Sequence, residues 1–138
     1  MENVTLATAQ KLVELGCKKA TQDFSRPICI AVCDADGHAI AFGRMDGSPL
    51  RSINISQQKA YTSVRMGVST DAFLARLKRD EIEIGYFCDP LFTALPGGNP
   101  LKNKEGKLIG GVGISGLAAS EDQVITEYLA GLVSAGQI

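Results

Sequence analysis

The 138-residue chain has no tryptophan, a single histidine and only 6% aromatic residues. It also lacks an excess of charge of either sign, since 14 Lys and Arg face 15 Asp and Glu for a net charge of −1. Nucleic acids are usually bound through clustered basic residues, so this balance argues against such a partner. No run of about 18 apolar residues is present, which argues against a membrane span. We therefore expect neither nucleic acid nor a membrane as a partner.

Two further features are missing. The N-terminal MENVTLATAQ has no basic region followed by an apolar one, as a signal peptide would, so we expect a cytoplasmic protein. Cys29 and Cys33 lie in an expected strand, roughly 13 Å apart at the usual rise per residue, which is too far for a disulfide. No C-x-x-C pair offers a zinc or redox site. We expect four free, buried thiols and no metal.

The chain otherwise has an ordinary globular composition, with 45% hydrophobic and 21% charged residues. No linker, repeat or low-complexity tract divides it, so we expect one domain over 1–138. Apolar spacing and turn residues predict, in chain order, a helix over 5–23, strands over 27–34 and 38–45, helices over 49–66 and 69–79, a strand over 108–115 and a helix over 121–135.

Capping residues and turns refine this prediction. The expected N-caps are Thr5, Ser48 before Pro49, and Ser69 or Thr70, and SEDQ at 120–123 has the pattern of a capping box. Residues 80–100 are less regular and leave room for two further strands. Hairpin-connected strands flanked by helices favour an α+β fold with an antiparallel sheet.

The stretch IGGVGISG at 109–116 contains the G-x-G-x-x-G spelling of a dinucleotide-binding turn. Such a site also needs a second parallel strand and an acidic residue about 20 residues further on to hold the ribose. The final helix occupies most of the chain that follows Gly116, so no second strand can be built. We therefore expect no nucleotide cofactor.

Three expected strands alternate small with bulky residues. The small residues are Cys29, Ala31 and Cys33 in the first, Ala39, Ala41 and Gly43 in the second, and Gly111, Gly113 and Ser115 in the third. If these faces align, one side of the sheet is a flat surface for close approach, because glycines otherwise weaken a strand. A helix with small residues such as Ala9, Gly16 and Ala20 is the favoured occupant, and a flat ligand or another subunit is the alternative.

Few side chains could carry chemistry. His38 is the only histidine and follows a turn that holds Asp34 and Asp36. These three could gather a divalent metal, but the later ligands of a calcium loop are missing, so a solvated turn is favoured.

The RMDGS segment brings Arg44, Asp46 and Ser48 to an expected helix start. Free N–H groups at that start and the guanidinium fork would suit a carboxylate or phosphate. A salt bridge between Arg44 and Asp46 is the equally weighted alternative. Lys59, further along the helix, could point to this corner, although its position favours solvent.

Several motifs together resemble a known family. They are V-x-D-x-x-G-H-x-x-A-F-x-R-M-D-G at 32–47, K-A-Y-T at 59–62, P-G-G-x-P at 96–100, and I-G-x-V-G-I-S-G at 109–116 followed by Asp122. In this order, over nearly the whole chain, they are similar to the HbpS/GlcG family, which includes the C-terminal domain of PduO-type corrinoid adenosyltransferases.

The resemblance implies a profilin-like α+β fold, with a five-stranded antiparallel sheet flanked by helices on both faces. It also implies homo-oligomers, from dimers to tetramers or octamers, and binding of haem or a corrinoid. The signature positions that the resemblance offers as ligand-binding are His38, Arg44, Asp46, Lys59, Pro96, Gly97, Gly98 and Ser115. It assigns no catalytic residue.

One departure concerns the haem ligand. Haem-binding members of the PduO branch use a histidine near the first helix, where this chain has Gln10, Lys11 and Cys17 instead. Haem could then be ligated by His38, Met45 or Cys17, or lie without an axial protein ligand.

The favoured function is a small cytoplasmic, oligomeric protein that binds haem, a related tetrapyrrole or corrinoid, or a small anionic cofactor. The resemblance implies an accessory role in glycolate, diol or glycerol utilisation. A structural or regulatory subunit of a neighbouring enzyme is one alternative. The other is an enzyme for a small hydroxy-acid or aldehyde, with Arg44 on the carboxylate and His38 or Asp46 as acid or base.

Overall fold

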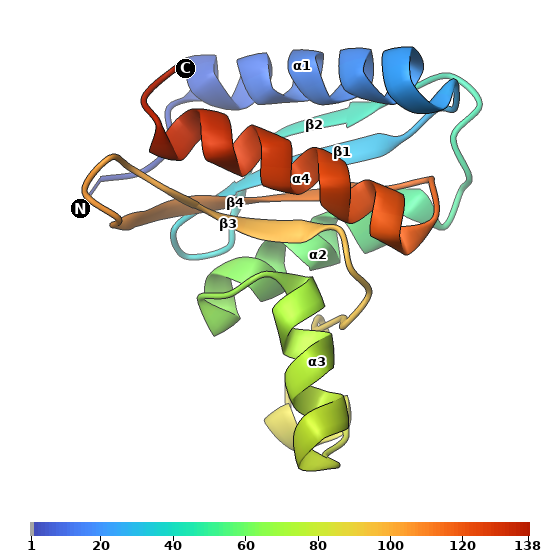
Figure 1. Ribbon diagram of the computed structural model, residues 1–138, viewed down its shortest axis with the longest axis vertical. Helices are drawn as coiled ribbons and strands as arrows, with labels where there is room; N and C mark the ends of the chain where they lie inside the picture. The colour runs from blue at the N-terminus through green and yellow to red at the C-terminus, as the bar shows by residue number, and fades with distance from the viewer. Residues whose placement is uncertain (1) are drawn as a thin grey trace.

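The computed structural model describes residues 2–138 and has an α+β fold (Figure 1). Its elements are α1 (Leu6–Phe24), β1 (Cys29–Asp34), β2 (Ala39–Arg44), α2 (Ser52–Met66), α3 (Thr70–Asp80), the 3₁₀ helix η1 (Ile84–Phe87), β3 (Gly98–Lys102), β4 (Leu108–Ser115) and α4 (Ala119–Ser134). No helix in this part of the chain combines the length and the apolar character needed to cross a bilayer.

The strands form an antiparallel sheet in the order β2-β1-β4-β3. The expectation of a five-stranded sheet is therefore wrong for residues 2–138, where the sheet has four strands. The irregular region 80–100 is the reason, since only its last residues join the ladder. Phe87 and Phe92 from that region pack against Phe73 of α3 instead of entering the sheet.

Helices cover both faces of the sheet, as expected. α1 and α4 pack on one face and α2 packs on the other (Figure 1). The main hydrophobic core lies between the sheet and the α1–α4 layer. Its fully buried members include Leu12, Ile30, Val112, Ile114, Ile125 and Leu129. Bulky residues of β1 and β4 thus face this layer, and their small residues face α2.

The helix starts are partly as predicted. Thr5 caps α1 and Ser69 caps α3, each through a side-chain oxygen that accepts a backbone N–H at 3.1 Å. The prediction that Ser48 caps a helix from residue 49 is wrong. Its hydroxyl donates to the Met45 carbonyl oxygen at 2.6 Å, and α2 begins only at Ser52 after a turn.

The start of α4 also differs from the prediction. The helix begins at Ala119, two residues before the predicted 121, so Ser120 is inside it and caps nothing. The carboxylate of Glu121 reaches back and accepts the backbone N–H of Ala118 at 3.1 Å. Glu121 therefore provides a hydrogen-bond partner for this N–H group at the start of α4 without a capping hydroxyl.

The glycines of β4 allow α2 to pack closely against the sheet. Gly111 and Gly113 pair with Cys33 and Ala31 of β1, so the small faces of these two strands align. A Cβ atom at Gly111 would lie 2.7 Å from the carbonyl oxygen of Ala60 in α2. A helix thus occupies this face, as favoured, but it is α2 rather than the first helix.

The predicted alignment fails in β2. Ala41 and Gly43 pair with the bulky residues of β1 and face α1. An irregularity in the ladder then shifts the register, so that Ala39 pairs with Cys33 and turns to the α2 side. Strict alternation could not reveal this bulge, because it depends on pairing with β1.

Candidate functional site

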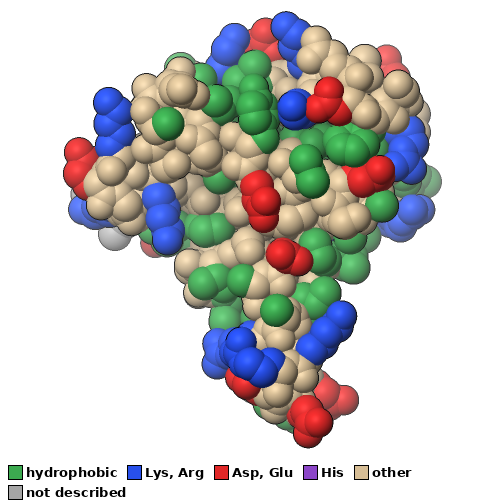
Figure 2. Space-filling model, in the orientation of Figure 1, with side chains coloured by type: hydrophobic (Ala, Val, Ile, Leu, Met, Phe, Trp, Pro, Cys, Tyr) green, Lys and Arg blue, Asp and Glu red, His purple; other side chains and the backbone are tan. Residues whose placement is uncertain are grey.

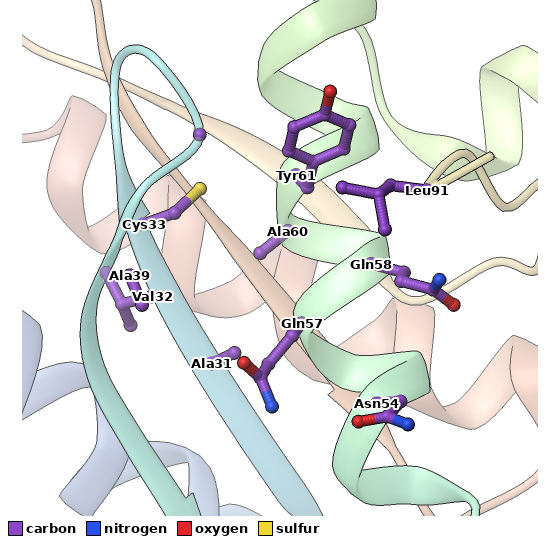
Figure 3. A pocket seen from close by; sticks show the side chains of 11 residues that line it. Ala31, Val32, Cys33, Ala39, Asn54, Gln57, Gln58, Ala60, Tyr61 and Leu91 are labelled. Carbon is purple, nitrogen blue, oxygen red and sulfur yellow. The ribbon is translucent and has the colours of Figure 1, made fainter. Parts of the chain in front are cut away.

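A cleft opens between α2 and the β1–β2 hairpin (Figure 3). Its volume is about 400 Å³, which lies within the range of small-molecule sites. The side chains around it are Ala31, Cys33 and Ala39 from the strands, Asn54, Gln57, Gln58, Ala60 and Tyr61 from α2, and Leu91 from the segment after η1. None of these side chains is acidic or basic, so the cleft suits an apolar body.

The packing of α2 explains the position of the cleft. α2 rests on β4, β1 and β3, while β2 at the sheet edge lies mostly outside its cover. The floor is deep because Ala31 and Ala39 carry only a methyl group there. The amide side chains of Asn54 and Gln57, three residues apart on α2, stand over this floor.

One end of the cleft is fixed by Tyr61. Its hydroxyl donates a 2.5 Å hydrogen bond to Asp89, and this bond raises the pKa of Tyr61 and lowers that of Asp89. The same carboxylate accepts the backbone N–H of Leu91 at 3.0 Å, which holds the opposite wall. The Arg65 guanidinium lies 4.9 Å from the ring centroid of Tyr61 and brings positive charge close to this end.

Cys33 at the cleft floor is 4% exposed. Burial, aided by the Asp34 carboxylate, raises the pKa of its thiol to about 12. Because alkylating reagents attack the thiolate, iodoacetamide at about pH 8 should leave Cys33 unmodified and react with Cys88. Cys88 is exposed, contrary to the expectation that all four thiols are buried. Peptide mass spectrometry measures both sites, and equal modification in the folded protein would contradict the assignment.

Lys59 does not point to solvent, so that expectation is wrong. It is 1% exposed, and its ammonium donates to the carbonyl oxygen of Ile114 at 2.7 Å and to the Asp122 carboxylate at 3.1 Å. Burial lowers the pKa of Lys59 and raises that of Asp122, and their mutual attraction opposes both shifts. This pair joins α2, β4 and α4 inside the protein.

The loop at 96–98 closes over that ion pair. A Cβ atom at Gly97 would lie 2.8 Å from the Lys59 ammonium, and Gly97 has a φ of +121°, which favours glycine. The N–H of Gly97 donates to Gln123 and that of Gly98 donates to the hydroxyl of Thr70. The structure thus brings Lys59, Gly97 and Gly98 together in a closed polar cluster, with Pro96 half-buried at its edge.

The other signature residues lie apart from this cluster. Ser115 is buried and hydrogen-bonds the hydroxyl of Ser52 at 3.1 Å. His38 is exposed and adjoins Gly37, which lines the cleft, whereas Arg44 and Asp46 are exposed at the far end of β2. Within residues 2–138, the ion pairs do not include one between Arg44 and Asp46. The RMDGS corner and the P-G-G loop therefore do not share one site.

In residues 2–138, no three His, Cys, Asp or Glu side chains gather in a way that could hold a metal ion. Asp34 instead accepts the backbone N–H groups of Asp36 and His38 at 2.9 Å each and so closes the hairpin turn.

Sequence reasoning missed the α2 wall of the cleft. Asn54, Gln57 and Tyr61 have helical spacing and share one face of α2. That partly polar face, on a helix whose other side meets small strand residues, was the signal available. That signal did not locate the cleft, because only the fold shows which strand α2 leaves uncovered.

The fold and the cleft define a small α+β protein whose antiparallel sheet lies between helices and borders a ligand-sized cleft. A family model described as "Haem degrading protein HbpS-like" matches residues 4–130, so the chain belongs to the HbpS-like family. The resemblance drawn from the motifs is therefore confirmed.

Known relatives agree with this assignment. Protein GlcG of Escherichia coli K12 is 31% identical over 107 residues, which cover 78% of this chain and 77% of that protein. The crystal structure of a double mutant of Streptomyces reticuli HbpS superposes with a TM-score of 0.86 at 25% identity and covers 96% of this chain and 88% of that one. The PduOC:haem complex shares the fold, with a TM-score of 0.83 at 24% identity and 94% coverage of both chains.

Proposed function

We propose that this protein is a cytoplasmic, self-associating binding protein for haem or a related tetrapyrrole or corrinoid, with the cleft as the ligand site. The observation that carries the proposal is the cleft itself, an uncharged slot of about 400 Å³ floored by small residues. The family description and the haem complex of PduOC support the choice of ligand. Its role is accessory to glycolate, diol or glycerol utilisation.

The residues around the cleft fit such a ligand in two respects. Alanine methyl groups and Leu91 offer apolar contact to a ring, and the Arg65 guanidinium, next to Tyr61, can meet a ring carboxylate at the mouth. For the iron, His38 is the candidate because its neighbour Gly37 lines the cleft. A neutral Cys33 thiol, with its pKa of about 12, is a poor ligand. Bound haem would supply its iron chemistry there.

Haemin titration tests the proposal. The wild type should shift the Soret band and saturate at one haemin per chain. Ala39→Leu should weaken binding by about tenfold or more, because three added carbons fill the cleft from an edge strand where the fold tolerates them. Ala118→Leu is the control, since Ala118 is exposed at the start of α4 on the opposite face of the sheet.

His38→Ala separates ligation from pocket shape. It should change the position of the Soret band while the far-ultraviolet circular dichroism stays that of the wild type, because His38 is exposed. Absence of a saturable band shift in the wild type, or identical affinities for Ala39→Leu and Ala118→Leu, would refute the cleft as the site.

A second candidate is an accessory subunit without a bound cofactor. It is favoured by the burial of Lys59, Gly97 and Gly98, because these signature residues lie in the interior and are not among the residues that line the cleft. A tagged protein that brings down a stoichiometric enzyme and fails to bind haemin would support this candidate over the first.

A further inference from the structure

α3 and η1 form an arm that projects away from the sheet and its helices (Figure 1). The arm has a small aromatic interior, in which Phe73 meets Phe87 edge-on with ring centroids 5.1 Å apart and Phe92 at 5.8 Å. Phe73 is fully buried. The arm is thus an ordered structure that extends the surface of the protein.

The outside of the arm keeps large apolar side chains in solvent. Tyr86 on η1 is 65% exposed, and Leu95 on the returning segment is 47% exposed. A projecting element that leaves an aromatic side chain and a leucine uncovered has the character of a contact surface.

Charge along the arm is arranged in two blocks. α3 carries Arg76, Lys78 and Arg79 near its end, and Asp80, Glu81 and Glu83 follow at the tip. Figure 2 shows this sequence as basic side chains on the arm above acidic ones at its tip. Two such arms laid antiparallel place the basic block of each beside the acidic tip of the other.

Ion pairs within the arm involve only some of the charged side chains in each block. Arg76 and Arg79 both lie near Asp80, at 3.8 and 3.1 Å. Within residues 2–138, Lys78, Glu81 and Glu83 take part in no ion pair. These three exposed charges are the ones free to meet a second arm.

We propose that the arm docks against the arm of a second copy of this chain around a two-fold axis. Lys78 then faces Glu81 and Glu83 of the partner subunit, and the apolar side chains of the arm are covered. An isologous contact of this kind uses each charge pair twice. The proposal rests on the self-association proposed above and names its surface.

Docking at the arm also bears on the cleft. The returning segment of the arm supplies Asp89, which holds Tyr61, and Leu91, which lines the cleft wall. A second arm that covers this segment holds the wall in place. Self-association and ligand binding therefore act on the same stretch of chain.

A charge exchange between two variants tests the contact. Lys78→Glu places like charges opposite each other at both copies of the two-fold contact, and so does the double variant Glu81→Lys/Glu83→Lys. Each variant should therefore have a dimer dissociation constant about tenfold or more above that of the wild type. An equimolar mixture of the two restores both pairs and should regain the wild-type mass. Sedimentation velocity follows the change against the protomer mass of 14.6 kDa.

Lys18→Glu is the control, because Lys18 is exposed on α1, far from the arm. It should keep the wild-type mass. A monomeric wild type, an unchanged mass for both arm variants, an equal loss in Lys18→Glu, or a mixture that fails to reassociate would each overturn the proposal. Haemin titration of the wild type is a separate readout, since failure of the wild type to bind haemin refutes the proposed function and leaves the mass pattern of the variants to decide the arm.

Discussion

Gly113→Ala should destabilise the protein by about 3 kcal/mol, among the largest effects of any single methyl group in this chain. The added Cβ would lie 2.5 Å from the backbone nitrogen of Ala60 and closer still to the carbonyl oxygen of Ser56. Both atoms belong to the backbone of α2, so a rotamer change cannot relieve the contact. The helix must move away from β4 and lose packing along its length.

Urea unfolding measures this effect, with Gly131→Ala as the matched control. Gly131 is in α4, and a Cβ atom there would meet nothing within 4 Å. The same substitution should therefore stabilise the protein by roughly 0.5 to 1 kcal/mol, because alanine loses less backbone entropy in a helix. If Gly113→Ala unfolds at the urea concentration of the wild type, α2 does not rest directly on β4.

Local signals predicted the elements well because each depends on neighbours in the chain. The strand over 108–115 and the helices over 5–23 and 69–79 lie within one residue of the observed bounds. Ser48 failed as a cap although its local context was favourable. Its hydroxyl hydrogen-bonds the Met45 carbonyl oxygen, and the turn that follows delays the helix.

The faces of the sheet were predictable only in part. The alternation in β1 and β4 holds, since Ala31 and Gly113 pair directly. In β2 the bulge puts Ala39 on the α2 side and Gly43 under α1. Pairing register is a property of two strands, so the sequence of one strand does not determine it.

The candidate site shows the same limit over longer distances. The motifs correctly indicated the family, but they grouped residues that lie in different places in the fold and have different structural roles. Lys59 and Asp122 are far apart in sequence and meet only once α2 and α4 are placed on opposite faces of the sheet. The cleft exists because α2 leaves β2 uncovered, and no local pattern states which strand a helix will cover.

The G-x-G-x-x-G spelling gains a physical meaning from this packing. Gly111 and Gly113 admit the backbone of α2, and Gly116 has a φ of +141° where the chain turns from β4 toward α4. Each glycine is thus required by a close contact or by its conformation. Substitution of any of these three glycines should therefore act mainly on the stability of the protein rather than on ligand binding.

Lys59→Met should cost about 3 to 5 kcal/mol of unfolding free energy, because it leaves Asp122 as a buried charge without a partner. Both side chains are 2% exposed, so water cannot replace the ammonium. Lys18→Met on the surface of α1 is the control and should change stability by less than about 0.5 kcal/mol.

The double variant Lys59→Met/Asp122→Asn should be about 1 to 2 kcal/mol more stable than Lys59→Met alone. Asparagine keeps an oxygen for the N–H of Leu117, which Asp122 accepts at 3.1 Å, and it removes the uncompensated charge. If the cost of Lys59→Met came from lost side-chain volume, the second substitution would not reduce it. Recovery of stability in the double variant would therefore show that the cost comes from the unpaired charge.

The pH dependence gives a further signature of the buried pair. Burial already raises the pKa of Asp122, and without Lys59 the folded-state pKa rises further above the ordinary 3.8. The folded variant then binds more protons than the unfolded chain, so its stability falls as the pH rises through that range. The cost of Lys59→Met should therefore shrink as the pH is lowered toward 3.8. A cost that is the same at acidic and neutral pH would mean that Asp122 does not carry the penalty.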